Sequence, residues 1–102
     1  MELILSVEEL SKVDGGIALC LAATALGTFP ILIAGTEAHK QKYLPKIVKA
    51  EKIAAFGLTE AQAGSDAGAI RTTAVKDGDS YILNGTKCFI SNAGEAEIYS
   101  II

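Results

Sequence analysis

Apolar residues recur with helical spacing at the start of the chain. Leu3, Val7 and Leu10 follow the i, i+4 and i+7 pattern, which places their side chains on one face of a helix. Few turn-forming residues interrupt this stretch, so we predict an amphipathic helix over residues 2–12. The Gly15-Gly16 pair is expected to end it.

A second helix is expected over about residues 16–28, and it is apolar nearly all round. It lies in the uncharged run 15–36, which approaches the ~20 residues needed to cross a bilayer. The segment GTFP, residues 27–30, interrupts that run, and the pieces on either side are short and rich in alanine. The pattern therefore favours a buried core helix over a membrane anchor.

Two further short helices are expected before residue 52. Thr36 is predicted to cap the first, with Glu37 in its first turn. Pro45 fits the first turn of the second, over residues 46–50. His39 lies in a polar stretch beside lysines, so we interpret it as a solvated surface residue without a catalytic partner.

Beyond residue 52 the apolar positions shift to period two. Asp77-Gly78 and Asn84-Gly85 are dipeptides that supply the positive φ of tight hairpin turns, and short β-rich runs flank them. We predict strands over residues 70–76, 80–84, 86–91 and 97–102. The last strand ends the chain without a closing turn, so the antiparallel sheet is expected to be incomplete. The fold class is therefore α+β.

Composition narrows the classes of protein to which this 102-residue chain can belong. Half of the residues are hydrophobic and 21% are charged, with a mean hydropathy of +0.36. Such a chain is too apolar for disorder and forms at most one modest domain, so part of its apolar surface is expected to meet another surface. Its net charge of −3 and scattered basic residues offer no patch for nucleic acid.

The cysteines and the first residues bear on the compartment. Cys20 and Cys88 lie far apart and outside any CxxC spacing, so we predict two free thiols, with neither a disulfide nor a metal site. Glu2, Glu8 and Glu9 stand where an export signal would be basic. We therefore expect no export signal and a cytoplasmic protein.

The stretch GLTEAQAGSDAGA, residues 57–69, joins the helical half to the β-rich half. It has no histidine, cysteine or lysine, which argues against a nucleophile or a metal site. Its small residues let backbone N–H groups approach a ligand, and Thr59 and Ser65 add hydroxyl donors. Such donors, beside apolar Phe56 and Leu58, suit a planar heteroaromatic ligand with phosphates. A flexible linker of the same composition stays an alternative.

This stretch resembles the first signature of the acyl-CoA dehydrogenases, position by position. The signature has a small residue, an aliphatic one, Ser or Thr, Glu, two variable residues, a small one, Gly, Ser or Thr, Asp, two variable residues and a small one. The likeness continues upstream through LGTFPILIAGTEAHKQKYLPKIVKAEKIAAFGLTE and downstream through YILNGTKCFISNAGEAEIYSII. It implies part of the family's N-terminal α-helical bundle domain over residues 1–52. The first antiparallel hairpins of its β-barrel-like middle domain would follow over 53–102.

The resemblance implies an FAD-dependent oxidoreductase of fatty acid metabolism. Such enzymes take a proton and a hydride from adjacent carbons of an acyl-CoA thioester, and an electron-transfer flavoprotein accepts the electrons. The family further implies a homotetramer without a membrane span, in the cytoplasm or, in a eukaryote, in the mitochondrial matrix. We interpret the acyl group as short or branched.

Two segments would hold the flavin if the family's contacts are carried over. In the first, Thr59 would bind the pyrimidine side of the isoalloxazine, and in the second, Ser91 would donate to the flavin where the hydride arrives. Residues 89 and 91 project from one face of the predicted strand, although an ordinary strand face would show the same pair. The residues implied are Phe56, Leu58, Thr59, Gly64 and Ser65, then Phe89, Ile90 and Ser91.

Other implied features concern the substrate and two departures from the family. Ser65 would lie where the phosphate-bearing chains approach, and Ala22 and Leu26 would line the acyl pocket, although close helix packing explains their type equally well.

The family commonly has Trp at the position of Phe89 and Thr at that of Ser91, so the flavin edge is expected to be packed less fully.

The resemblance places no catalytic residue in this chain. The family's general base is a glutamate of the C-terminal domain, so we expect a truncated chain that is inactive alone. Glu60 and Asp66 look structural, capping turns or pairing with basic groups. A non-catalytic interaction module that uses the apolar run 15–34 as its contact surface stays an alternative.

Overall fold

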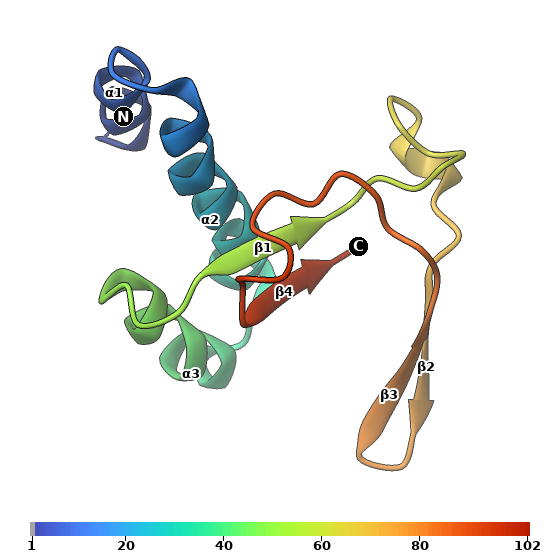
Figure 1. Cartoon of the computed structure of the whole chain (residues 1–102). Coiled ribbons are helices and arrows are strands. Elements are labelled where there is room, and N and C mark those ends of the chain that lie inside the picture. Colours follow the sequence, from blue (N-terminus) through green and yellow to red (C-terminus); the bar gives the residue numbers. More distant parts are fainter. Residues whose placement is uncertain (1) are drawn as a thin grey trace. The chain divides into compact units, whose positions relative to one another are not determined.

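The computed structural model describes residues 2–102 (Figure 1). The chain divides into two compact units, which are described separately: one runs to Phe56 and includes Ser91–Ser100, and the other comprises Gly57–Ile90 with Ile101 and Ile102. The elements, in order, are α1 (Glu2–Ser11), α2 (Gly15–Ala34), α3 (Glu37–Val48), β1 (Ala54–Gly57), the 3-10 turn η1 (Ala67–Ala69), β2 (Thr73–Asp77), β3 (Ser80–Asn84) and β4 (Ile98–Ile101).

Helix α1 forms where the apolar spacing predicted it, but the following glycines do not end it. Asp14 is the N-cap of α2, and its side chain accepts a hydrogen bond of 2.9 Å from the Ile17 N–H. An aspartate cap satisfies a free N–H at the start of a helix and lets Gly15 and Gly16 enter the first turn. The two glycines therefore begin α2, contrary to the prediction.

Helix α2 runs unbroken through Pro30, so the predicted interruption at residues 27–30 is wrong. A proline inside a helix removes a single N–H donor, which here would have bonded the Leu26 carbonyl. The Thr28 hydroxyl donates back to the Thr24 carbonyl at 2.7 Å in the preceding turn. By length and composition this helix is apolar enough to cross a membrane, as core helices of soluble proteins also are.

Helix α3 is one helix where two were expected. Thr36 caps it as predicted, because its hydroxyl accepts the His39 N–H at 3.2 Å. Pro45 lies inside the last turn rather than at the start of a separate helix over residues 46–50. His39 is exposed, as interpreted from its polar surroundings.

The core of the first unit is built from small residues. Gly27 of α2 is buried against β1, and a Cβ added to it would lie 2.7–2.8 Å from backbone atoms of Ala55. The Ser100 hydroxyl of β4 donates to the Gly27 carbonyl at 2.7 Å. Strands β1 and β4 are hydrogen-bonded neighbours and run in the same direction (Figure 1). The other buried apolar residues of this unit are Ala18, Ala23, Ala54, Ala55 and Ala96.

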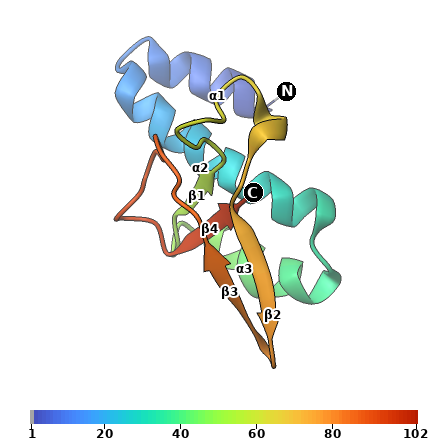
Figure 2. The same cartoon turned by 90° about the vertical axis from the view of Figure 1, so that its right-hand side faces the viewer.

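The second unit contains the hairpin predicted at Asp77-Gly78. Strands β2 and β3 pair antiparallel, with Val75 opposite Ile82, and Gly78 has a φ of 58°, as the first residue of a tight hairpin turn requires (Figure 2). The strand predicted over residues 86–91 is wrong, because the chain is irregular from Gly85 to Ile90. This segment is held by side-chain contacts, and it does not pair with another strand.

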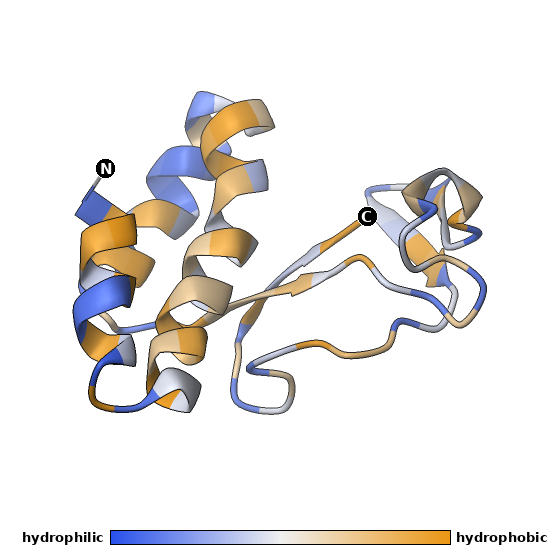
Figure 3. Ribbon diagram, turned by 90° about the horizontal axis from the view of Figure 1, so that it is seen from above, coloured by the Kyte–Doolittle hydropathy of each residue, from blue (hydrophilic) through white to orange (hydrophobic). Residues whose placement is uncertain are grey.

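Many large apolar side chains stay exposed in both units. No large side chain among residues 2–102 is fully buried, and hydrophobic positions recur along the helices (Figure 3). On α2, Leu19 and Leu26 are 56% and 46% exposed, so this helix buries only its small residues. The expectation of a buried core helix therefore holds for one side of α2.

Candidate functional site

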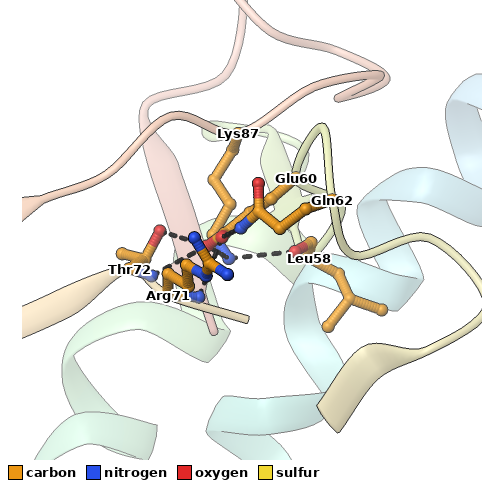
Figure 4. Close-up of polar contacts among 6 residues, drawn as sticks. All are labelled: Leu58, Glu60, Gln62, Arg71, Thr72 and Lys87. Atoms are coloured by element: carbon orange, nitrogen blue, oxygen red, sulfur yellow. Dashed lines mark hydrogen bonds and ion pairs between the residues drawn. The ribbon is translucent and has the colours of Figure 1, made fainter. Parts of the chain in front are cut away.

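A buried carboxylate lies at the centre of the GLTEAQAGSDAGA stretch. The Glu60 side chain is 4% exposed and accepts five hydrogen bonds (Figure 4). Its Oε1 accepts from Lys87 Nζ at 2.8 Å, and from the Thr72 N–H at 2.9 Å and the Thr72 hydroxyl. Its Oε2 accepts from the Arg71 N–H at 2.8 Å and from the Gln62 amide. We call these residues, with Leu58, the Glu60 cluster.

The cluster closes the loop at both ends. Glu60 and Ala63 exchange backbone hydrogen bonds of 3.1 and 3.0 Å, which close a tight turn between them, and Ala63 is buried. The Arg71 and Thr72 amides lie just before β2 and reach the same carboxylate. Since one side chain binds residues on either side of the loop 64–70, it sets where that loop begins and ends.

Lys87 connects this loop to the second predicted flavin segment. Its side chain is 6% exposed, and its ammonium group donates to the Leu58 carbonyl at 2.9 Å as well as to Glu60. The next residue adds a backbone bond, from the Cys88 N–H to the Thr59 carbonyl at 2.8 Å. These contacts hold Leu58 and Thr59 beside the residues that immediately precede Phe89.

The charges of the cluster indicate a structural carboxylate. The Lys87 ammonium, the Thr72 hydroxyl and the Arg71 N–H hold the pKa of the Glu60 carboxyl far below its ordinary value of 4.5. A carboxylate so strongly favoured in its ionised form is a poor proton acceptor at neutral pH. Asp66, the other acidic residue of the stretch, makes no side-chain cap at the start of η1.

The predicted flavin contacts differ in accessibility. Leu58, Thr59 and Ile90 are half-buried, whereas Gly64 and Ser65 are exposed. Phe56 is half-buried in β1, in the other unit. No comparison tests these residues as flavin contacts, so they stay predictions.

Phe89 and Ser91 do not share a strand face, contrary to the prediction. Phe89 is 94% exposed and has a φ of 55°, a left-handed conformation that no regular strand contains. Ser91 is exposed and begins a turn in the first unit. The side-chain contacts of Lys87 and the backbone bond of Cys88 take the place of strand pairing here.

The hydroxyl groups that are not used in hydrogen bonds within the chain suit an isoalloxazine ring. Within residues 2–102, the hydroxyls of Thr59 and Ser65 donate to no other group, and Gly64 would accommodate a Cβ with no atom within 4 Å. A flavin presents ring nitrogens and carbonyl oxygens, which accept such hydrogen bonds, and a flat face, which an exposed aromatic ring such as Phe89 can contact. The residues present are therefore compatible with FAD.

The predicted acyl contacts lie on α2. Ala22 is half-buried and Leu26 is 46% exposed, so part of this helix surface is open to a ligand or another chain segment. Their role also stays a prediction.

Lys87 was missed at the sequence level. Its signal is a single charge inside the apolar run TKCFI, but its partner Glu60 lies 27 residues away, which no local pattern reveals. Strand β1 was missed too, although the short apolar run from Ile53 to Phe56 before a glycine is typical of a buried strand.

Comparison with known families decides the identity. The family described as acyl-CoA dehydrogenase, N-terminal domain, matches residues 1–51, and acyl-CoA dehydrogenase, middle domain, matches residues 55–102. This chain belongs to the acyl-CoA dehydrogenase family. Its three helices and small sheets are the family's N-terminal helical domain and the start of its middle β domain, which confirms the predicted fold class. The boundary at residue 52 stays a prediction.

Solved structures of this family are closely similar to the chain. It is 51% identical to butyryl-CoA dehydrogenase from Megasphaera elsdenii, with a TM-score of 0.89 over 96% of this chain and 26% of that one. A structure described as an electron transferring flavoprotein of Acidaminococcus fermentans is 55% identical, with a TM-score of 0.91 over the same shares. An acyl-CoA dehydrogenase of Bacillus anthracis complexed with FAD is 39% identical, with a TM-score of 0.79 over 84% of this chain and 15% of that one. The chain thus spans about a quarter of the length of the curated relatives it matches.

Proposed function

We propose that this chain forms the flavin-holding part of an FAD-dependent acyl-CoA dehydrogenase. The observation that carries the proposal is the Glu60 cluster, which fixes Leu58 and Thr59 next to the segment that ends in Phe89. Bound FAD would supply the hydride acceptor for α,β-dehydrogenation of an acyl-CoA thioester. The FAD complex of the Bacillus anthracis relative supports this cofactor.

The Glu60 cluster would hold Thr59 in place for the cofactor. Thr59 would donate its hydroxyl to the pyrimidine side of the ring, and Ser65 would donate where phosphate-bearing chains pass. Because Glu60 and Lys87 satisfy each other inside the cluster, neither competes for these ligand atoms. Preorganised donors of this kind stabilise the negative charge that a flavin gains when it is reduced.

The substrate would be a short or branched acyl-CoA. Ala22 and Leu26 present small and aliphatic side chains on α2, and Ser65 stands ready for the phosphate-bearing part of the thioester. The butyryl-CoA dehydrogenase relative supports a short acyl chain. The electrons would pass to an electron-transfer flavoprotein, within a homotetramer in the cytoplasm or the mitochondrial matrix.

The base that removes the α-proton would come from the part of the family's length that this chain does not span. Glu60 is excluded from that role by its low pKa and its five hydrogen bonds. The chain alone would therefore bind FAD without oxidising substrate.

Titration of the chain with FAD, followed by its absorbance spectrum, tests this proposal. We expect a shifted flavin band and no bleaching when butyryl-CoA is added. Thr59→Val, which removes the hydroxyl with little change in shape, should weaken FAD binding about fivefold to tenfold. Thr73→Val, on exposed β2, is the matched control and should have no effect. An unshifted spectrum would refute the cofactor, and bleaching would refute the inactivity.

One observation favours a second candidate function, a non-catalytic interaction module. The exposed leucines of α2 would serve as its contact surface. Light scattering read together with the FAD titration separates the two functions, because only the module predicts a stable oligomer whose addition leaves the flavin spectrum unshifted.

A further inference from the structure

A single side-chain amide connects the turn after Ser91 to two other elements. Asn92 Nδ2 donates to the Cys20 carbonyl at 3.1 Å and to Thr24 Oγ1 at 3.1 Å, both on α2. The same nitrogen reaches the Ala54 carbonyl of β1 at 3.4 Å. All of these residues belong to the first unit, and the contacts join positions 38 to 72 residues apart in sequence.

The backbone of Asn92 has an unusual conformation and takes part in the same turn. Its φ is 66°, in the left-handed region that asparagine tolerates better than most residues. Its carbonyl accepts the N–H groups of Glu95 at 3.2 Å and Ala96 at 2.9 Å, and Ala96 is buried. The turn therefore closes on Asn92, while the amide of the same residue fixes that turn to α2 and β1.

We infer that Asn92 is a positioning residue that fixes the backbone of its neighbour Ser91 relative to helix α2. Ser91 is exposed and makes no hydrogen bond of its own within residues 2–102, so its place depends on its covalent neighbour. Asn92 contacts the helical turn from Cys20 to Thr24, which contains Ala22. One amide thus sets the distance between the serine and that turn. Only the final step, that this placement serves flavin binding, rests on the proposed function.

Amide hydrogen exchange of the chain without FAD tests the placement itself. Asn92→Asp keeps the shape and the tolerance for positive φ but has no N–H to donate. We expect the Glu95 and Ala96 amides to exchange at least about tenfold faster, since the turn opens more readily once the Asn92 amide no longer bonds α2 and β1. Asn84→Asp adds the same charge at the exposed end of β3 and should leave these two amides unchanged.

A glycine variant separates the conformation from the hydrogen bonds. Asn92→Gly accepts the positive φ but lacks the amide, so it should lose protection as Asn92→Asp does. If either variant keeps the protection of the unsubstituted chain, the inference is overturned. The Cys88 amide, bonded to Thr59 in the other unit, reports whether the variants remain folded there.

The flavin spectrum then tests the functional step. With Asn92→Gly, we expect FAD affinity to fall about tenfold and the shifted band to move towards that of free FAD. Unchanged affinity and spectrum, despite a loosened turn, would refute the positioning role. If the unsubstituted chain fails to bind FAD, the proposed function fails, and the exchange data still decide whether the Asn92 amide fixes the turn that follows Ser91.

Discussion

The Lys87 ammonium lies 2.8 Å from the Glu60 carboxylate, and both side chains are more than nine-tenths buried. A buried pair of this kind contributes less than its attraction implies, because both charges have left water. Removing one partner destabilises the fold strongly, since the other charge then stays buried without compensation. The pair is thus a point at which one substitution disturbs two segments of the chain together.

Lys87→Met tests this dependence. It leaves the Glu60 carboxylate without its cation and frees the Leu58 carbonyl, so the thermal midpoint should fall by roughly 10 °C or more. Lys76→Met, on the exposed hairpin, is the control and should shift the midpoint by only a few degrees at most. Circular dichroism melts measure both, and equal midpoints for the two variants would contradict the structural role of the pair.

Acid should destabilise the chain through Glu60. Because its pKa is lowered on folding, the unfolded chain binds more protons as the pH falls below 4.5, and the stability present above that value is lost. Glu97 acts in the same direction, since the Ile53 N–H and Lys52 lower its pKa. The thermal midpoint should therefore be level above about pH 5.5 and fall steadily below it.

Glu60→Gln separates the two carboxylates. The variant should be less stable at pH 7 and show a flatter acid profile, with the remaining slope due in part to Glu97. The same substitution at exposed Glu8 of α1 is the control. A Glu60→Gln profile as steep as that of the unsubstituted chain would show that the acid sensitivity arises elsewhere.

Gly27→Ala should separate α2 from β1. Its Cβ would lie 2.7–2.8 Å from the backbone of Ala55, which cannot move aside as a side chain can, so we expect a loss of about 1–3 kcal/mol. Gly15→Ala is the matched control, with nothing within 4 Å of the added methyl, and should be neutral or stabilise by about 0.4–1 kcal/mol. Urea denaturation compares them, and equal effects would refute the close approach.

Ser100→Ala removes one buried hydrogen bond. The Ser100 hydroxyl is the donor to the Gly27 carbonyl, so its loss should cost about 0.5–1.5 kcal/mol of unfolding free energy. Ser80→Ala in exposed β3 should cost much less. Chemical denaturation is again the measurement, and a neutral Ser100→Ala would mean that this contact does not stabilise the fold.

Local patterns predicted the elements that local forces determine. The i, i+4 spacing of α1, the Thr36 cap and the turn at Gly78 each depend on neighbouring residues, and each was found. The errors have long-range causes. The segment before Ile90 is held by Glu60, which lies far back in the sequence, and α2 continues through Pro30 as part of a helix packed on β1.

The residues of the candidate site also differ in whether local sequence or long-range contacts determine their role. The residues from Leu58 to Ser65 stand in one continuous stretch whose order resembles the family signature, so the sequence could propose them as flavin contacts. Lys87 and Asn92 could not be proposed in this way, since each acts through partners that only the fold brings near. Single polar residues inside apolar runs are the one sequence signal that they share.

The small buried residues of the first unit have a thermodynamic consequence. Alanines and glycine leave little apolar area to be uncovered on unfolding, while many of the large aliphatic side chains are already partly exposed to water. The heat capacity increment of unfolding should therefore fall below the usual value of about 12–15 cal/mol/K per residue. The stability curve of this chain would be broad and shallow, and its response to denaturant gradual.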